Sequence, residues 1–422
     1  MARRLRPIER PAERVPGSEK QLVGHRVLRP LQFWLKKLHE LPAHGNRSLL
    51  ADHLLIAHLI AFLSPALKSL RRIQQVFEHA VARRRFGLPR VPKSTLSDAQ
   101  ALFDPALLAP IVADLRRRVP ALPHDPLLDR LLRKLVAVDG TFFALASRVV
   151  WALFNKPNAP AAAPKGSGRS ASRRKGNIRV DVHFDVIRGV PEQAILTDGR
   201  TPEYQTLAGH LQAGCFYVLD RAYHCYQMMA DILAAGSDFL VRLRQDMVFE
   251  VVQEHPLSAA DRLAGVLSVQ TVRAVGYRGR SALGPQRLRL VCIAQEDGPP
   301  IRLLTNRLDL EADLISLIYR YRWQVELFFR WLKCLVNFRH FFSESRNGIA
   351  LQIGAAIIGT LLIALIIEDR PSSYDWAMMT HVMNGLLPLD EETLRIMAET
   401  RAERARAARW QKAYRARQKT IA

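Results

Sequence analysis

Cysteine is scarce in this sequence, and its four residues of this type form no CxxC pair. They lie far apart or inside apolar runs, at Cys215, Cys225, Cys292 and Cys334. This excludes a disulfide-rich scaffold and a cysteine zinc site, and it predicts reduced, buried thiols in a cytosolic protein. We also expect no secretory signal, because the basic first residues MARRLRPIERPAERVPGSEK contain no apolar segment.

Long apolar runs are missing too, with one exception. Residues 349–367, IALQIGAAIIGTLLIALII, carry no charge and reach the length of about 18 residues that a membrane-spanning helix needs. The run stands alone, contains Gln352 and Thr360, and closely follows a basic amphipathic segment. A helix buried in a large soluble domain has the same pattern, and we expect that rather than a membrane span.

Acidic residues are outnumbered. The 422 residues include 39 Asp and Glu against 62 Lys and Arg, which gives a net charge of +23. Such a surplus is typical of a protein that binds a polyanion, either nucleic acid or an anionic membrane surface. Surface solubility needs far less charge but stays an alternative. The length allows two or three domains.

Residues 45–118 carry apolar side chains at helical spacing. Pro89 and Pro92 mark a turn within them, and Ser97, with Gln100 three residues later, is predicted to cap the next helix. Two helices around such a turn would suit a helix-turn-helix that binds DNA ends. Any helical bundle contains similar corners, so both interpretations stay open.

From residue 134 the pattern changes to short strands. KLVAVD, RVDVHFDVI, CFYVLD and DFLVRLR are apolar or alternating runs, and residues 247–305 also have mainly strand patterns. KPNAPAAAPKGSGRSASRRKGN is predicted to be a basic surface loop. Helices resume near residue 311, and the tail TRAERARAARWQKAYRARQKTIA predicts a solvated basic helix, or one that also touches DNA.

Two of these strands are predicted to end in an acid, Asp139 in VAVDGT and Asp220 in YVLDRAY. Side chains at the ends of neighbouring strands converge on one edge of an α/β sheet, where ligands usually bind. A single aspartate in such a place is more often a turn or helix cap. Two of them in a very basic chain favour a site.

A third acid, Glu326, stands in the basic segment YRYRWQVELFFRWLKCLVNFRHF, residues 319–341. On a helix, one face of this segment would carry Tyr319, Arg322, Trp323, Glu326, Arg330 and Lys333. Val325, Phe328 and Leu332, with Phe329 beside them, could pack toward the core. The glutamate could serve only as a salt-bridge partner of its neighbours. Alternatively, three carboxylates could hold two divalent ions while the flanking cations bind a phosphodiester.

The spacing of Tyr319, Arg322, Glu326 and Lys333 resembles the YREK signature of the DDE transposases grouped with insertion sequence four. VDGT and LDRAY resemble the two aspartate motifs of that family, and HFDVIRGVP, LLTNRLDL and SRNGIALQI resemble further family blocks. The resemblance extends from about residue 60 to residue 370, nearly the whole chain apart from its termini.

The resemblance implies an α/β fold: a ribonuclease-H-like catalytic core, with a mixed sheet flanked by helices, a β-rich insertion and an N-terminal helical domain. It implies that Asp139, Asp220 and Glu326 are the catalytic, metal-binding residues. Two Mg²⁺ ions would be bound, with Mn²⁺ able to substitute. The residues expected to contact DNA are Tyr319, Arg322, Trp323, Arg330 and Lys333.

The activity that the resemblance implies is cut-and-paste transposition. Water would cut the transposon end, the freed 3′ hydroxyl would attack the opposite strand to form a hairpin, and after a second hydrolysis it would attack target DNA. The partners would be double-stranded transposon ends and target DNA, bound by a homodimer in a synaptic complex. We expect the protein in a bacterial-type cytoplasm, associated with the nucleoid.

We expect five regions: a DNA-end-binding helical region (1–120), the first part of the catalytic core (121–246), the β-rich insertion (247–305), the second part of the core (306–370) and a basic helical tail (371–422). The chain departs from the family pattern at Ala222, where Gly is usual, and at Arg179 and Asp181. Asp181 could be an extra acid near the site or an exposed residue on an edge.

Two alternative functions stay open. A catalytically inactive DNA-binding remnant, or a repressor of transposition, would keep the charge but be free to lose an acid. A metal-dependent nuclease on the same fold would cut DNA without strand transfer. All three acids and the YREK set are present, which favours the transposase.

Overall fold

The computed structural model describes residues 23–64, 66–122, 124–131, 134–145, 176–295, 298–335 and 341–421. The chain forms two compact units, residues 1–120 with 335–422 and residues 121–334, called unit 1 and unit 2 below. The predicted basic loop lies outside the described residues except for its last two positions, as does the Cys334 side chain.

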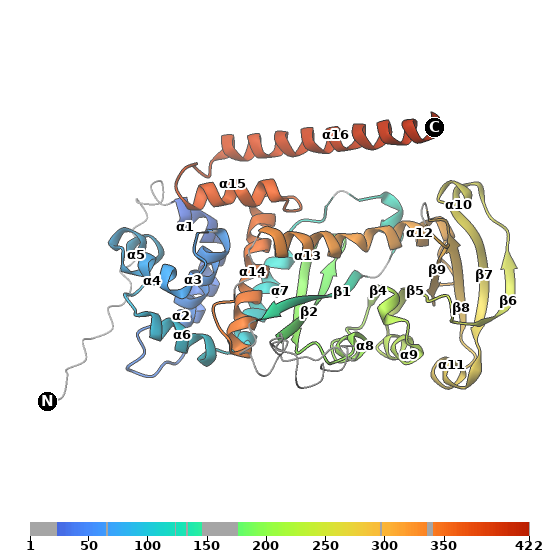
Figure 1. The fold of residues 1–422 in the computed structure, drawn as a ribbon, viewed down its shortest axis with the longest axis horizontal. Helices are drawn as coiled ribbons and strands as arrows, with labels where there is room; N and C mark the ends of the chain where they lie inside the picture. The colour runs from blue at the N-terminus through green and yellow to red at the C-terminus, as the bar shows by residue number, and fades with distance from the viewer. Residues whose placement is uncertain are drawn as a thin grey trace, which may run out of the picture. The chain divides into compact units, whose positions relative to one another are not determined.

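The described part of unit 1 is helical (Figure 1). Its helices are α1 (Val23–Leu28), α2 (Gln32–His39), α3 (Ala51–Leu63), α4 (Leu70–Glu78), α5 (Ala80–Phe86), α6 (Lys93–Leu102), α7 (Ala109–Arg118), α14 (Arg346–Ile367), α15 (Ser373–Met383) and α16 (Glu391–Ile421).

The apolar run near the C-terminus forms α14, which lies at the centre of unit 1. It contacts α3, α6 and α7, and 78% of its most apolar window is buried. Among the described residues it is the one helix long and apolar enough to cross a membrane, but its burial is that of a core helix. Its Gly359 backbone lies so close to Phe62 that a Cβ there would stand 2.5 Å from the ring.

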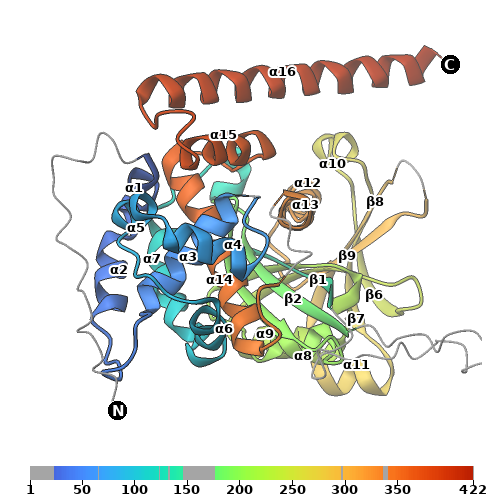
Figure 2. The ribbon, with the colours of Figure 1, turned by 60° about the vertical axis from the view of Figure 1, so that its left-hand side comes forward.

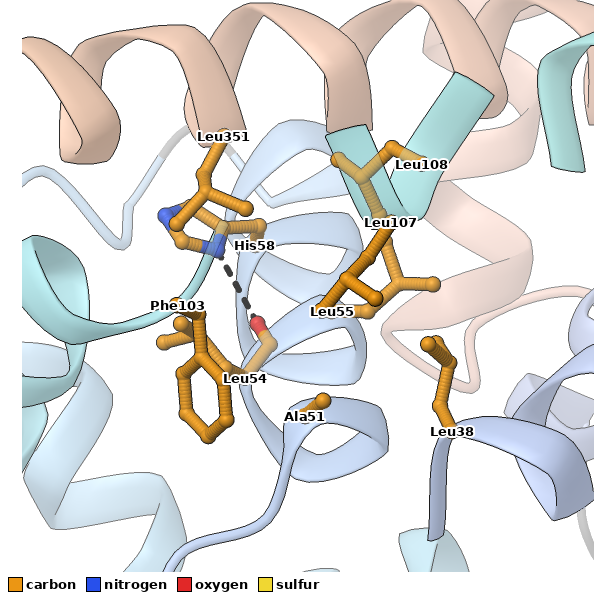
Figure 3. A pocket seen from close by; sticks show the side chains of 9 residues that line it. All are labelled: Leu38, Ala51, Leu54, Leu55, His58, Phe103, Leu107, Leu108 and Leu351. Atoms are coloured by element: carbon orange, nitrogen blue, oxygen red, sulfur yellow. Dashed lines mark hydrogen bonds between the residues drawn. The ribbon is translucent and has the colours of Figure 1, made fainter. Parts of the chain in front are cut away.

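A polar pair, His58 and Gln100, is buried in this helical core. His58 of α3 has Nδ1 at 3.0 Å from the Leu54 carbonyl oxygen (Figure 3). Its Nε2 lies 3.0 Å from Oε1 of Gln100. Leucines and Phe103 surround the ring. Burial lowers the pKa of His58 to about 4, so the imidazole is neutral at physiological pH.

The predicted capping box at Ser97 is wrong. Helix α6 begins at Lys93 directly after Pro92, so Ser97 lies inside the helix. Proline has no N–H to leave unpaired at a helix start, which suits it to this place. Gln100 is buried and serves the bond to His58 instead of a cap.

Unit 2 is built on one sheet of nine strands, in the order β3-β2-β1-β4-β5-β9-β8-β7-β6. The strands are β1 (Lys134–Leu145), β2 (Gly176–Asp185), β3 (Val190–Thr197), β4 (Cys215–Leu219), β5 (Asp238–Arg242), β6 (Phe249–His255), β7 (Val266–Ala274), β8 (Arg287–Ile293) and β9 (Ile301–Thr305). The helices are α8 (Glu203–Ala208), α9 (Tyr226–Ala234), α10 (Ala259–Leu263), α11 (Gly276–Leu283), α12 (Ala312–Tyr321) and α13 (Trp323–Leu335).

The first five strands form the predicted mixed sheet. Strand β1 is parallel to β4, and β4 to β5, whereas β2 is antiparallel to both β1 and β3. The strand patterns found in the sequence are confirmed, and β3, whose sequence VPEQAILT was not recognised, is added. The predicted β-rich insertion supplies β6 to β9, which continue the same sheet through the antiparallel pair of β5 and β9.

Helices cover both faces of the first five strands (Figures 1 and 2). Helices α8 and α9 lie on one face, where Val136 and Val138 of β1 join a core with Leu207 and Met228. Because side chains alternate along a strand, Asp139 points to the other face, along which α12 and α13 run.

The division into five functional regions stays a prediction. Helix α14, grouped with the catalytic core in that division, packs within unit 1. The described cysteines are free thiols as predicted, but only Cys215 is fully buried, whereas Cys225 and Cys292 are half-buried.

Candidate active site

The first predicted acid lies inside a strand, not at its end. Strand β1 continues beyond Asp139 to Leu145, paired with β2, so the prediction that the strand ends at the acid is wrong. What ends there is the pairing with β4, whose last pair is Val138 with Leu219. The acid therefore stands where β1 parts from β4, and its Oδ1 accepts the Gly140 N–H at 2.8 Å.

The second acid follows β4 directly. In the parallel register of β1 and β4, Asp220 is the residue after Leu219, as Asp139 is the residue after Val138. The two aspartates therefore leave the paired segment side by side at the carboxyl ends of these strands. Asp220 also caps a short 3-10 turn (Arg221–Tyr223), accepting the Arg221 N–H at 2.5 Å.

This turn contains Ala222, where the resembled family usually has Gly. Among the described residues, Glu368 is the one non-glycine with positive φ. Ala222 therefore adopts an ordinary backbone conformation, and its side chain causes no strain there.

The third acid comes from the helices on the same face. The predicted single helix is interrupted: α12 ends at Tyr321, Arg322 forms the junction, and α13 carries Glu326 in its first turn. The Arg322 guanidinium joins two of the acids, with Nη2 at 2.5 Å from Oε1 of Glu326 and Nη1 at 3.6 Å from Oδ2 of Asp139. Since Arg322 is buried, this arrangement is fixed by its surroundings.

The acids influence one another electrostatically. Burial raises the pKa of Asp139 to about 7, Arg322 lowers it in part, and the charges of Asp220 and Glu326 raise it further. Burial lowers the pKa of Arg322, but Tyr319, Asp220 and Glu326 together bring it above its ordinary value. The site therefore carries more negative charge than one arginine balances, and it would favour added cations.

The other residues of the predicted DNA-binding face differ in exposure. Trp323 and Arg330 are exposed, and Lys333 is half-buried with Nζ at 5.5 Å from the ring centre of Phe143. Tyr319 is buried, and its ring packs against the Arg322 guanidinium, which lies 5.5 Å from the ring centre. Core-facing positions of α13 are buried as predicted: Val325, Phe328, Phe329 and Leu332.

Asp181, whose role the sequence left open, forms a buried ion pair with Arg179 on the face of the sheet opposite to Asp139. Nε of Arg179 donates to both carboxylate oxygens of Asp181, at 2.9 and 3.0 Å, and its Nη2 donates to Thr206 at 2.9 Å. Asp181 pairs in register with Gly140 and is buried on an inner strand, so the interpretation as an exposed edge residue is wrong.

A further acid, Glu203, was missed. It opens α8, its Oε1 lies 3.2 Å from where a Cβ on Gly140 would stand, and burial raises its pKa. Nothing in its surrounding sequence, TPEYQTL, distinguishes it from an ordinary helix-start glutamate.

The three acids suit divalent cations by their chemistry. Carboxylate oxygens are the ligands that Mg²⁺ and Mn²⁺ prefer, and burial together with the neighbouring acids raises the pKa of Asp139, which a bound cation would offset. The arrangement is open, because Asp139, Asp220 and Glu326 do not bring their oxygens all within 4.8 Å of one another.

A tighter cluster of possible ligands occurs in unit 1, formed by His39, Asp52 and His53. His39 Nδ1 lies 3.0 Å from Oδ2 of Asp52, and His53 Nδ1 accepts the Leu50 N–H at 3.2 Å. A neutral His53 must then carry its proton on Nε2, the atom that faces Asp52 at 3.7 Å. The cluster is therefore a hydrogen-bonded link between α2 and α3 rather than a set of metal ligands.

Comparison with known proteins identifies the family of this chain. Residues 130–362, more than half of the chain, match the model of the family described as "Transposase DDE domain". The chain is 29% identical over 255 residues to "Putative transposase y4zB" of Sinorhizobium fredii, covering 57% of this chain and 70% of that protein. It is 23% identical over 316 residues to "Probable transposase for insertion sequence element IS5377" of Geobacillus stearothermophilus, covering 72% and 76%.

Among solved structures, the piggyBac transposase synaptic complex with hairpin DNA matches 90% of this chain and 80% of its own, at 11% identity and a TM-score of 0.37. The family match, by contrast, extends over more than half of the chain. The chain therefore belongs to the DDE transposases of the insertion-sequence-four type, enzymes that act on DNA.

Proposed function

We propose that this transposase moves an insertion sequence by cut-and-paste, with Asp139, Asp220 and Glu326 as its catalytic residues. The observation that carries the proposal is the Arg322 guanidinium, which joins Asp139 of β1 to Glu326 of α13, while the strand register places Asp220 next to Asp139.

The three carboxylates would hold the divalent ions, which are Mg²⁺ in this proposal. When bound, such ions stabilise the charge on the attacking and leaving oxygens of a phosphoryl transfer. Arg322 keeps Glu326 and Asp139 oriented before the ions arrive. The carboxylates themselves form no covalent bond with DNA, so the reaction needs no nucleophilic side chain.

The exposed face of α13 would hold the DNA end. Arg330 is exposed one turn beyond Glu326, where its guanidinium can bind a phosphate. Trp323 and Tyr277 are exposed aromatics that could stack on a base lifted from the duplex. Tyr319 would act through Arg322, since its ring is buried against that guanidinium.

The reaction would proceed in three stages. Water cuts one strand at the transposon end and leaves a 3′ hydroxyl, which attacks the opposite strand to form a hairpin. A second hydrolysis reopens the hairpin, and the same 3′ hydroxyl then attacks target DNA. Two ends must be joined in this process, so we propose a homodimer that acts in the cytoplasm at the nucleoid, with unit 1 contributing to binding of the ends.

The experiment is excision from a plasmid that carries the element's own ends, with Mg²⁺ present. We expect excision and insertion products from the wild type and none from Glu326→Gln, which should still bind the ends. Glu250→Gln, an exposed acid of β6, is the matched control and should act like the wild type.

Other outcomes separate the alternatives. If wild type and Glu326→Gln both bind the ends and neither cuts, the chain is an inactive remnant or a repressor. If the wild type cuts but never joins the 3′ end to a second DNA, the chain is a nuclease, and the transfer steps are wrong.

A further inference from the structure

The last helix of unit 1, α16, is buried in part over its first residues and exposed after them. In α16, Met397 and Thr393 are buried, and Arg401 Nη1 lies 2.6 Å from Oδ1 of the fully buried Asp375. After Arg401 every residue from 402 to 411 is exposed, while the helix continues to residue 421. The Arg404 guanidinium lies 4.5 Å from the ring centre of Tyr374, but residues 402–411 contribute no buried side chain, so burial within the unit does not explain the charge of this half.

Charge is segregated along α16. Residues 391–403 contain four acids and two arginines. From residue 404 to the last residue there are seven basic side chains and no acid: Arg404, Arg406, Arg409, Lys412, Arg415, Arg417 and Lys419. The net charge therefore changes from −2 to +7 between the two parts (2 − 4 and 7 − 0).

A solvated helix does not need this distribution. Exposed helices are stabilised by pairs of opposite charge at i and i+4, and the base of α16 has one in Arg395 and Glu399, at 2.8 Å. The second half contains no acid with which its cations could form such pairs. Like charges one turn apart, as at Arg406 and Arg409, destabilise the helix by roughly 0.3 kcal/mol per pair. Favourable interaction with the helix dipole is confined to the last turn.

We propose that the second half of α16, residues 404–421, binds the phosphate backbone of double-stranded DNA as a sequence-independent arm of this transposase. The partner is a polyanion because a concentrated, unbalanced positive charge is what such a partner stabilises. At about 1.5 Å per residue, these 18 residues extend about 27 Å, along which a duplex presents roughly 16 negative charges. The small alanine side chains between the Arg and Lys residues would let the helix approach the phosphate backbone of the DNA closely.

The test measures how DNA affinity depends on salt, with a duplex that lacks the element's ends and with no divalent metal. The variant Arg406→Gln/Arg409→Gln/Arg415→Gln removes three charges. If each binds one phosphate, the slope of log K against log salt should become shallower by about 2.7. The matched control Arg406→Lys/Arg409→Lys/Arg415→Lys keeps the charge and should keep the slope. Thermal unfolding should be unchanged in both, because Arg406 and Arg409 are exposed.

Three results would overturn the proposal: an unchanged slope in the glutamine variant, an equal loss in the lysine variant, or a loss of self-association with the slope intact. The last would make this half of α16 an interface between copies of the chain, as sedimentation of both variants would show. None of these measurements depends on cleavage, so failure here leaves the catalytic proposal standing, and the reverse also holds.

Discussion

Replacing Asp139 by asparagine should make the metal-free protein more stable at neutral pH while it abolishes cleavage. The pKa of Asp139 is raised from 3.8 to about 7, chiefly by burial. An ionised carboxylate in this place therefore costs at most about 4 kcal/mol of folding free energy. Asparagine has the same shape and still accepts the Gly140 N–H, but it carries no charge.

The effect must depend on pH in a defined way. In the unfolded chain the carboxyl group loses its proton near pH 3.8, whereas in the folded protein it keeps the proton until about pH 7. The stability of the wild type therefore falls as the pH rises from about 4 to about 7 and is then constant, as far as this group is concerned. The asparagine variant lacks this contribution.

The assay is urea denaturation of both proteins in EDTA at several pH values. We expect the advantage of Asp139→Asn to grow with pH and to reach about 1–4 kcal/mol at pH 8. The control Asp246→Asn, an exposed residue, should gain no advantage that grows with pH. A difference that is the same at every pH, or a variant less stable than the wild type at pH 8, would refute the reasoning.

Three further predictions concern stability. Arg322→Ala should cost about 2–4 kcal/mol in urea denaturation, because two carboxylates lose their buried partner, and a loss near zero would contradict the assigned contacts. Gly140→Ala should cost about 1–3 kcal/mol, because its Cβ would stand 2.6 Å from Oδ1 of Asp181, whereas Gly45→Ala, with open space around it, should be nearly neutral. As the pH falls from 6.5 to about 4, the stability of the wild type relative to His58→Gln should fall by up to about 3 kcal/mol, because buried His58 stays neutral while the unfolded chain takes up a proton.

Short-range patterns predicted much of the fold. The first strands were recognisable because each is a short apolar or alternating run, and the buried face of α13 followed from helical spacing. Strand β3 escaped because Pro191 and Glu192 interrupt its pattern. The sequence predicts the end of β1 too early, at Asp139, because an acid after an apolar run is typical of a strand end. Pairing with β2 continues the strand through Phe142 and Phe143.

The sequence patterns singled out the three acids of the proposed site, but not the contacts around them. The break between α12 and α13 and the Arg322 bridge depend on tertiary packing, which no helical pattern contains. The Arg179–Asp181 pair and Glu203 depend on which strands are neighbours, and neighbours in a sheet are set by topology. Likewise, the N-terminus of α6 was decided by Pro92 and by a buried bond of Gln100 that local capping rules do not include.

We propose that Asp139, Asp220 and Glu326 together bind the divalent ions that DNA cleavage requires. The most direct measurement is a titration with Mn²⁺, followed by electron paramagnetic resonance, of the DNA-end complex of the wild type and of Glu326→Gln. We predict two ions for each wild-type active site and a weakened or missing second ion in the variant. Equal stoichiometry and affinity in both proteins would contradict the claim.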